Sequence, residues 1–119
     1  MQKICLIGQF DSVVKSLYQE LVNYFQTQFC SNEPEQISDM LSMAKQDLIF
    51  LDYDMPEGDG KETFEQIKQM EQAKDVPVVF LTSIRDKKRI EEVLSLKPAG
   101  YVLKPAEQSR IFETLEELL

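Results

Sequence analysis

Five short apolar runs alternate along this chain with segments whose apolar residues recur at helical spacing. The run at 48–51 does not alternate polar and apolar residues and is too short for a core helix, so it predicts a strand buried on both faces. The other predicted strands are 3–7, 76–81 and 100–103, with a weaker edge strand at 27–30. Because right-handed crossovers place helices on both faces of a parallel sheet, this alternation predicts an α/β fold. We expect a doubly wound five-stranded parallel sheet of order 2-1-3-4-5 in a single domain over residues 1–119.

The segments between the strands carry the usual signals for helix starts. Predicted helices begin at Asp11 or Ser12, Pro34, Gly60, Asp86 and Glu107. Their apolar positions keep helical spacing and should face the sheet. These positions are Val14, Leu17, Leu21 and Phe25; Ile37, Met40, Leu41 and Ala44; Phe64, Ile67 and Met70; Ile90, Val93 and Leu94; and Ile111, Leu115 and Leu118.

Composition excludes several classes of function. The chain has no histidine, which rules out Ser-His-Asp and Cys-His catalysis, histidine metal sites and a phosphohistidine carrier. Its net charge of −8 argues against direct nucleic-acid binding, since phosphate contacts need a basic face. No apolar run approaches the ~20 residues of a membrane span, and we expect a cytoplasmic protein. Cys5 and Cys30 lack a metal-ligand spacing and are expected to be buried, reduced thiols.

The carboxyl ends of four predicted strands should meet at one rim of the sheet, where ligands bind in such folds. The rim residues are Gly8, Gln9, Asp52, Thr82, Ser83 and Lys104. Each alone has a plainer explanation, as a turn, strand or solvated surface residue. Together they suit a phosphoryl group: a carboxylate can form an acyl phosphate, and lysine and threonine can contact phosphate oxygens. Ser83 is small and would leave room for the incoming group.

The rim residues lie in three ordered motifs that resemble the response-regulator receiver domain of two-component signalling. The motifs are Asp52-x-x-Met55-Pro56-x-x-Asp59-Gly60, Pro77-Val78-Val79-Phe80-Leu81-Thr82-Ser83 and Gly100-Tyr101-x-x-Lys104-Pro105. The resemblance covers residues 3–119 and implies the flavodoxin-like receiver fold.

The resemblance also implies roles for individual residues. Asp52 would accept phosphate from the phosphohistidine of a sensor histidine kinase or phosphotransfer protein, and Thr82 and Lys104 would contact the phosphoryl group. Tyr101 matches an aromatic switch residue, and Lys104-Pro105 matches a dipeptide whose peptide bond is usually cis. Apart from self-phosphorylation and self-dephosphorylation at Asp52, no enzyme activity is implied.

The expected magnesium site departs from the family pattern. Receivers hold Mg²⁺ mainly with an acidic pair after the first strand, where this chain has Gly8 and Gln9. Mg²⁺ prefers hard oxygen ligands, so Asp52 alone would bind it weakly. Asp54 is a candidate substitute because strand alternation turns it toward the side of Asp52. Asp11 is a second candidate, although capping the first helix is its simpler role.

Three functions remain open from the sequence. The first is a receiver that is phosphorylated on Asp52 and switches a partner-binding face or an output domain. The second is a degenerate receiver that binds a partner or dimerises without phosphorylation, with Lys104 paired directly to Asp52. The third is a flavodoxin-like cofactor carrier, although the loop after the first strand lacks the Ser, Thr and Gly that would cradle a phosphate. The resemblance implies a docking or homodimer face that spans the fourth helix to the fifth helix. The basic cluster at 85–89 is either part of that face or a solvated helix start.

Overall fold

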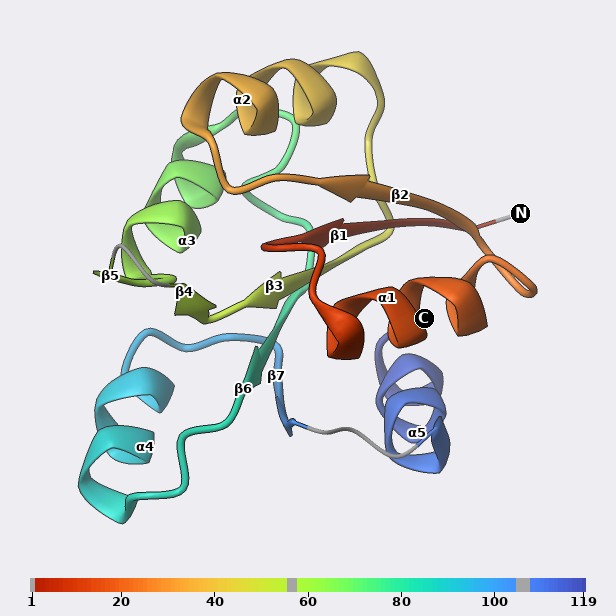
Figure 1. The fold of residues 1–119 in the computed structure, drawn as a ribbon. Helices are drawn as coiled ribbons and strands as arrows, with labels where there is room; N and C mark the ends of the chain where they lie inside the picture. Colours follow the sequence, from red (N-terminus) through yellow and green to blue (C-terminus); the bar gives the residue numbers. More distant parts are fainter. Residues whose placement is uncertain (1, 56–57, 105–107) are drawn as a thin grey trace.

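A five-stranded parallel sheet forms the centre of the molecule (Figure 1). The structure is a computed structural model that describes residues 2–55, 58–104 and 108–119. Across the sheet the strands are β2 (Gln26–Cys30), β1 (Lys3–Ile7), β3 (Leu48–Asp52), β6 (Val78–Thr82) and β7 (Gly100–Leu103). Counting only these strands along the chain gives the order 2-1-3-4-5, so the predicted topology is confirmed, with β2 at one edge.

Helices cover both faces of the sheet, as Figure 1 shows. One face is covered by α1 (Ser12–Leu21) and α5 (Gln108–Leu118). The other face is covered by α2 (Pro34–Met43), α3 (Lys61–Gln69) and α4 (Lys87–Leu94). Among the residues that the structure describes, no helix is long and apolar enough to cross a membrane.

Strand β3 divides the hydrophobic core into two layers, because successive side chains point to opposite faces of a sheet. Ile49 and Leu51 pack in the layer beneath α2, α3 and α4, while Leu48 and Phe50 pack in the layer beneath α1 and α5. All five residues of β3 are buried. Since full burial of one such apolar side chain contributes about 2 kcal/mol, these contacts hold the end of β3, and with it Asp52, firmly in place.

Two helix starts follow the predicted capping chemistry. The Asp11 carboxylate accepts a hydrogen bond from the Val14 amide at 2.9 Å, so Asp11 rather than Ser12 is the cap of α1. The Asp86 carboxylate likewise accepts from the Arg89 amide at 3.2 Å at the start of α4. Each cap satisfies a backbone donor that the first helical turn leaves unpaired.

Several predicted boundaries and faces were wrong. Helix α1 ends at Leu21, and Phe25 packs against the core from the connection to β2. Helix α3 ends at Gln69, and Met70, which was predicted to lie on the apolar face of this helix, follows it with an extended backbone of φ −84° and ψ 129°. Leu94 is 46% exposed, although its spacing matched the apolar face of α4. The start of the last helix at Glu107 lies outside the described residues.

Two further boundaries shift slightly. Ala44 follows α2 with an extended backbone instead of continuing the helix. Strand β6 begins at Val78, whereas the sequence predicted 76; Val76 is buried all the same. Pro77 has no amide hydrogen and enters the sheet only through its carbonyl, which accepts from the Ile49 amide at 2.9 Å.

A short hairpin that the sequence analysis had not predicted follows β3. Strand β4 (Asp54–Met55) pairs antiparallel with β5 (Gly58–Asp59). Gly60 then passes so close to Tyr53 that a β carbon on Gly60 would lie 3.1 Å from the Tyr53 α carbon. Pro56 lies outside the described residues. The hairpin begins with Asp54, two residues after Asp52.

Candidate functional site

Three predicted rim residues lie at the carboxyl ends of three adjacent strands. Asp52 is the last residue of β3, Thr82 is the last residue of β6, and Lys104 directly follows β7. The Lys104 amide donates to the Thr82 carbonyl at 2.8 Å, which extends the pairing of β6 with β7 and fixes the start of the lysine side chain. Asp52 is 1% exposed and Thr82 is fully buried. The structure therefore brings these three side chains together, as the spacing predicted.

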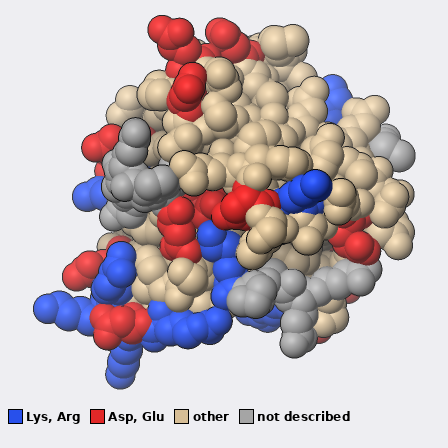
Figure 2. All heavy atoms as spheres, in the orientation of Figure 1, with Lys and Arg blue, Asp and Glu red and all other residues tan. Residues whose placement is uncertain are grey.

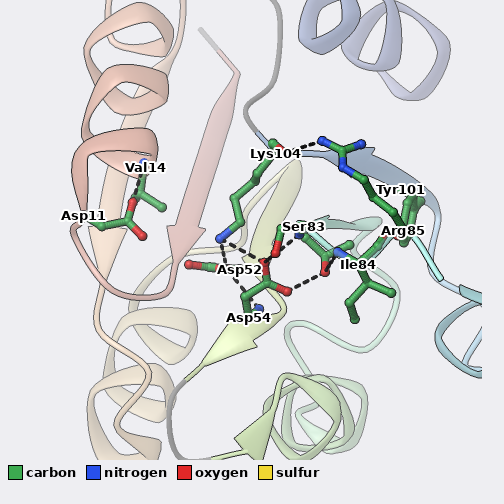
Figure 3. A network of polar contacts seen from close by, with 10 residues as sticks. Asp11, Val14, Asp52, Asp54, Ser83, Ile84, Arg85, Tyr101 and Lys104 are labelled. Atoms are coloured by element: carbon green, nitrogen blue, oxygen red, sulfur yellow. Dashed lines mark hydrogen bonds and ion pairs between the residues drawn. The ribbon is translucent and has the colours of Figure 1, made fainter. Parts of the chain in front are cut away.

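The Lys104 ammonium lies between two carboxylates (Figure 3). Its Nζ is 2.8 Å from Oδ1 of Asp52 and 3.4 Å from Oδ2 of Asp54. The Asp54 amide also donates to Oδ1 of Asp52 at 3.1 Å. The direct pairing of Lys104 with Asp52 was one of the arrangements expected for a receiver without phosphate.

Asp54 accepts more hydrogen bonds than any other carboxylate of this site. Thr82 Oγ1 donates to its Oδ1 at 2.5 Å. The Ser83 amide and the Ser83 hydroxyl donate to its Oδ2 at 2.6 and 2.8 Å. Asp54 therefore lies on the same side as Asp52, as strand alternation predicted. It contacts donors at the ends of both β6 and β7.

Burial and hydrogen bonding shift the pKa values of the two carboxyls in opposite directions. Burial raises the pKa of Asp52, although the hydrogen bond and charge of Lys104 act against it. For Asp54, burial also acts to raise the pKa, but hydrogen bonds from Thr82 and Ser83 and the charge of Lys104 outweigh it, so its pKa is lowered. Burial alone would lower the pKa of Lys104, yet the two carboxylates raise it. Asp54 is thus the more acidic partner of a lysine that stays charged at neutral pH.

The segment after β6 links this site to Tyr101 (Figure 3). Thr82 Oγ1 accepts from the Ile84 amide at 3.1 Å, and the Tyr101 hydroxyl donates to the Ile84 carbonyl at 2.7 Å. Arg85 donates to the Lys104 carbonyl at 3.0 Å. Tyr101, the predicted switch residue, is therefore two hydrogen bonds away from Thr82, through a single residue.

Among the described residues, the segment after β1 places Gly8 rather than an acidic side chain against Asp52. A β carbon on Gly8 would lie 2.5 Å from the β carbon of Asp52, which is too close for any side chain without movement of the backbone. Gln9 is exposed, and Asp11 is used as the helix cap. The described residues contain no group of three or more His, Cys, Asp or Glu that could hold a metal ion.

Comparisons with known proteins place this geometry in a family. The family model for the response regulator receiver domain matches residues 9–116. The chain belongs to the receiver family. This receiver is 26% identical over 106 residues to the transcriptional regulatory protein CrdR of Helicobacter pylori, covering 88% of the chain and 49% of that protein. The receiver therefore spans about half the length of this relative.

Two Vibrio cholerae proteins match this receiver over nearly its full length. The chemotaxis protein CheY-3 is 25% identical over 119 residues, which cover 98% of the receiver and 90% of that protein. The solved structure of the chemotaxis protein CheY4 superposes with a TM-score of 0.86 at 20% identity, over 100% of the receiver and 99% of that chain. The second likeness supports the receiver fold.

The receiver motifs located the main members of the site but not its arrangement. Pro105, with its expected cis bond, lies outside the described residues. Ser83 was expected to leave space for a phosphoryl group, yet both its amide and its hydroxyl donate to Asp54. The central position of Asp54 was missed. Two features of the sequence could have indicated it. One is the acid two residues after Asp52, and the other is the pair Thr82 and Ser83, which offers hydroxyl and amide donors at the end of the neighbouring strand.

Proposed function

We propose that this receiver accepts a phosphoryl group on Asp52 from the phosphohistidine of a histidine kinase or phosphotransfer protein. The observation that supports this proposal is the convergence of Asp52, Thr82 and Lys104, with Lys104 Nζ 2.8 Å from the acceptor carboxylate. An Asp52 oxygen would attack phosphorus, a P–O bond would form, and the P–N bond to the donor histidine would break. The electron pair of that bond would leave on the imidazole nitrogen. Lys104 and Thr82 would then stabilise the phosphoryl oxygens.

The side chains near Asp52 fit a divalent cation poorly. Gly8 has no side chain, and one oxygen of Asp52 already faces the Lys104 ammonium. Mg²⁺ in protein sites is held by carboxylates and other hard oxygen ligands, and a lysine ammonium close by repels it. We therefore propose that the positive charge at this site comes from Lys104 and that Mg²⁺ binds weakly.

A surface beside the site suits the transfer of a signal to a partner. Arg85, Lys87, Lys88 and Arg89 lie at and just before the start of α4, and Figure 2 shows blue side chains gathered over this helix in the lower left. Asp86, Glu91 and Glu92 are exposed in the same segment, so this surface is only slightly basic, and an acidic partner would recognise it through the four basic side chains. Hydrogen bonds from Tyr101 through Ile84 to Thr82, and from Thr82 to Asp54, lead from the segment before α4 to the residue whose amide donates to Asp52. Phosphorylation would alter this face for an output domain, a partner protein or a second copy of the receiver.

A phosphorylation-independent binding module is the second candidate. The contact of Gly8 with Asp52 and the pairing of Lys104 with Asp52 favour it, because both stabilise the site without phosphate. In this alternative the same α4 surface would bind its partner constitutively.

Incubation with a small acyl phosphate donor, with and without Mg²⁺, followed by intact-mass measurement, tests the two candidates. The phosphoacceptor function predicts that the parent gains one phosphate and that Asp52→Asn gains none. Asp39→Asn changes an exposed acid on α2 and should gain phosphate like the parent. If the parent stays unmodified under both conditions, the binding module is the better description.

A further inference from the structure

Three kinds of donor converge on one position at the ends of β6 and β7. They are the Thr82 hydroxyl, the Ser83 amide with its hydroxyl, and the Lys104 ammonium. A hydroxyl, a backbone N–H and a lysine are together a typical site for the oxygens of an anion. In this chain an anion already lies there, because all of these groups contact the carboxylate of Asp54 (Figure 3).

We propose that Asp54 is an internal ligand of the anion site that phosphoryl oxygens on Asp52 would otherwise occupy. This inference rests on the proposed function only for the identity of the competing group. The Asp54 carboxylate contacts both Thr82 and Lys104, the two residues assigned to the phosphoryl group. It also lies next to the acceptor, since the Asp54 amide donates to Asp52 at 3.1 Å.

The contacts of Asp54 distinguish this role from two simpler ones. A solvated loop acid would be mostly exposed, whereas the Asp54 side chain is 24% exposed and hydrogen-bonded through both oxygens. A magnesium ligand would turn an oxygen toward a cation site. Both Asp54 oxygens instead face protein donors, with an ammonium 3.4 Å from one of them. An internal ligand accounts for all of these contacts.

The two anions would compete for the same donors. When Asp54 occupies the site, Thr82 and Ser83 are held in place without phosphate. A phosphoryl group arriving on Asp52 would have to displace the Asp54 carboxylate from these donors. Asp54 therefore slows phosphorylation of Asp52. Through Thr82 it also holds residues 82–84, and with them the hydrogen bond from Tyr101 to Ile84, in their present positions.

Inorganic phosphate is a direct probe of the anion site. The variants are made in an Asp52→Asn background, which cannot form an acyl phosphate, so the result does not depend on the proposed function. Phosphate is titrated while the chemical shifts of the Ser83 and Lys104 amides are recorded. We expect Asp54→Ala to bind phosphate at least tenfold more tightly than the background protein, because it frees the donors. Asp39→Ala removes the same charge from the exposed side of α2 and should bind like the background.

Two further variants keep the result interpretable. Asp54→Asn retains the side-chain shape and, by losing the charge, should bind phosphate with intermediate affinity; it serves if Asp54→Ala does not fold. Adding Thr82→Val to Asp54→Ala removes one donor and should weaken the gained binding. Equal affinities in the background, Asp54→Asn and Asp54→Ala would overturn the internal-ligand inference. Tight phosphate binding by Asp54→Ala together with no mass gain in the parent would instead contradict only phosphorylation at Asp52.

Discussion

The end of β1 and the ends of β6 and β7 approach the same carboxylate, Asp52, from opposite sides. On the β6–β7 side, Lys104 contacts Asp52 while Thr82 and Ser83 contact Asp54, and every one of these contacts is a hydrogen bond or an ion pair. On the β1 side, Gly8 meets Asp52 through backbone alone. One side therefore stabilises the site by charge, and the other stabilises it by close packing.

In this receiver the hydrogen-bond donors at the ends of β6 and β7 are present, while Gly8 and Gln9 rather than an acidic pair follow β1. An acidic pair near Asp52 would concentrate negative charge that a bound cation must balance. Here Gly8 and Gln9 contribute no charge, and the Lys104 ammonium offsets part of the negative charge of Asp52 and Asp54. The protein itself therefore supplies positive charge at this site. The predictions below test each side separately.

Replacing the lysine should have the largest effect on stability. Lys104→Met leaves Asp52 buried without its partner, and removal of one member of a buried ion pair costs about 3 kcal/mol or more. We expect a loss of about that size in the free energy of unfolding, measured by urea denaturation at neutral pH. An unchanged midpoint would show that Lys104 is not the main stabiliser of this side.

The double variant Lys104→Met/Asp52→Asn separates charge from packing. If an unpaired carboxylate causes the loss, removing the carboxylate as well should recover a large part of it. The loss in Lys104→Met should also shrink as the pH falls toward the ordinary range for aspartate. The pKa of Asp52 is raised in the folded parent although Lys104 acts to lower it, so loss of Lys104 raises it further, and the folded variant takes up a proton at Asp52 before the unfolded chain does. Asp54, whose pKa is lowered in the parent, contributes in the opposite sense, so parent and variant are compared at each pH.

A methyl group at Gly8 tests the packing side. The β carbon of Gly8→Ala would lie 2.5 Å from that of Asp52, so strand β1 or β3 must shift. Overpacking of this kind costs about 1–3 kcal/mol, and we expect thermal or urea unfolding to report a loss in that range. Gln9→Ala changes an exposed neighbour and should stay within about 0.5 kcal/mol of the parent. Equal stabilities of the two variants would mean that Gly8 does not pack closely against Asp52.

Most of the fold could be predicted from the sequence because its signals are local. The apolar run 48–51 gave β3 within one residue, and Asp11 and Asp86 gave two helix starts through capping chemistry. The predicted helix boundaries were wrong where tertiary contacts, rather than local sequence signals, determine the backbone conformation. Phe25 packs against the core from the connection between α1 and β2. Met70 lies outside α3, although its spacing matched the apolar face of that helix.

The site was predictable in its members and much less so in its contacts. Asp52, Thr82 and Lys104 meet because parallel strands end at the same edge, which follows from topology. The hairpin that presents Asp54 to Thr82 and Ser83 was not predicted, because a two-residue strand has no periodicity to detect. The fit of Gly8 against Asp52 leaves no room for a β carbon on Gly8, a detail that no sequence pattern encodes.

The cysteines offer a probe of local opening on the β1 side, with the smallest expected effect. Cys5 lies in β1, and the carbonyl of Cys30 accepts from the Gly8 amide at 3.1 Å. Both thiols are free and buried, and burial raises the pKa of Cys5 to about 12 and of Cys30 to about 11. A pKa near 11 in place of 9.0 lowers the thiolate fraction at pH 8 roughly a hundredfold, so alkylation should be slow in the native protein.

Alkylation of Cys30, followed by peptide mass measurement, then compares the two sides directly. Gly8→Ala disturbs the backbone next to Cys30 and should speed its alkylation more than the loss of global stability accounts for. Lys104→Met acts across the sheet and should speed alkylation only in proportion to global unfolding. Gln9→Ala should leave the rate at the parental value. If Lys104→Met exposed Cys30 as selectively as Gly8→Ala does, the two sides of the rim would form one cooperative unit rather than two.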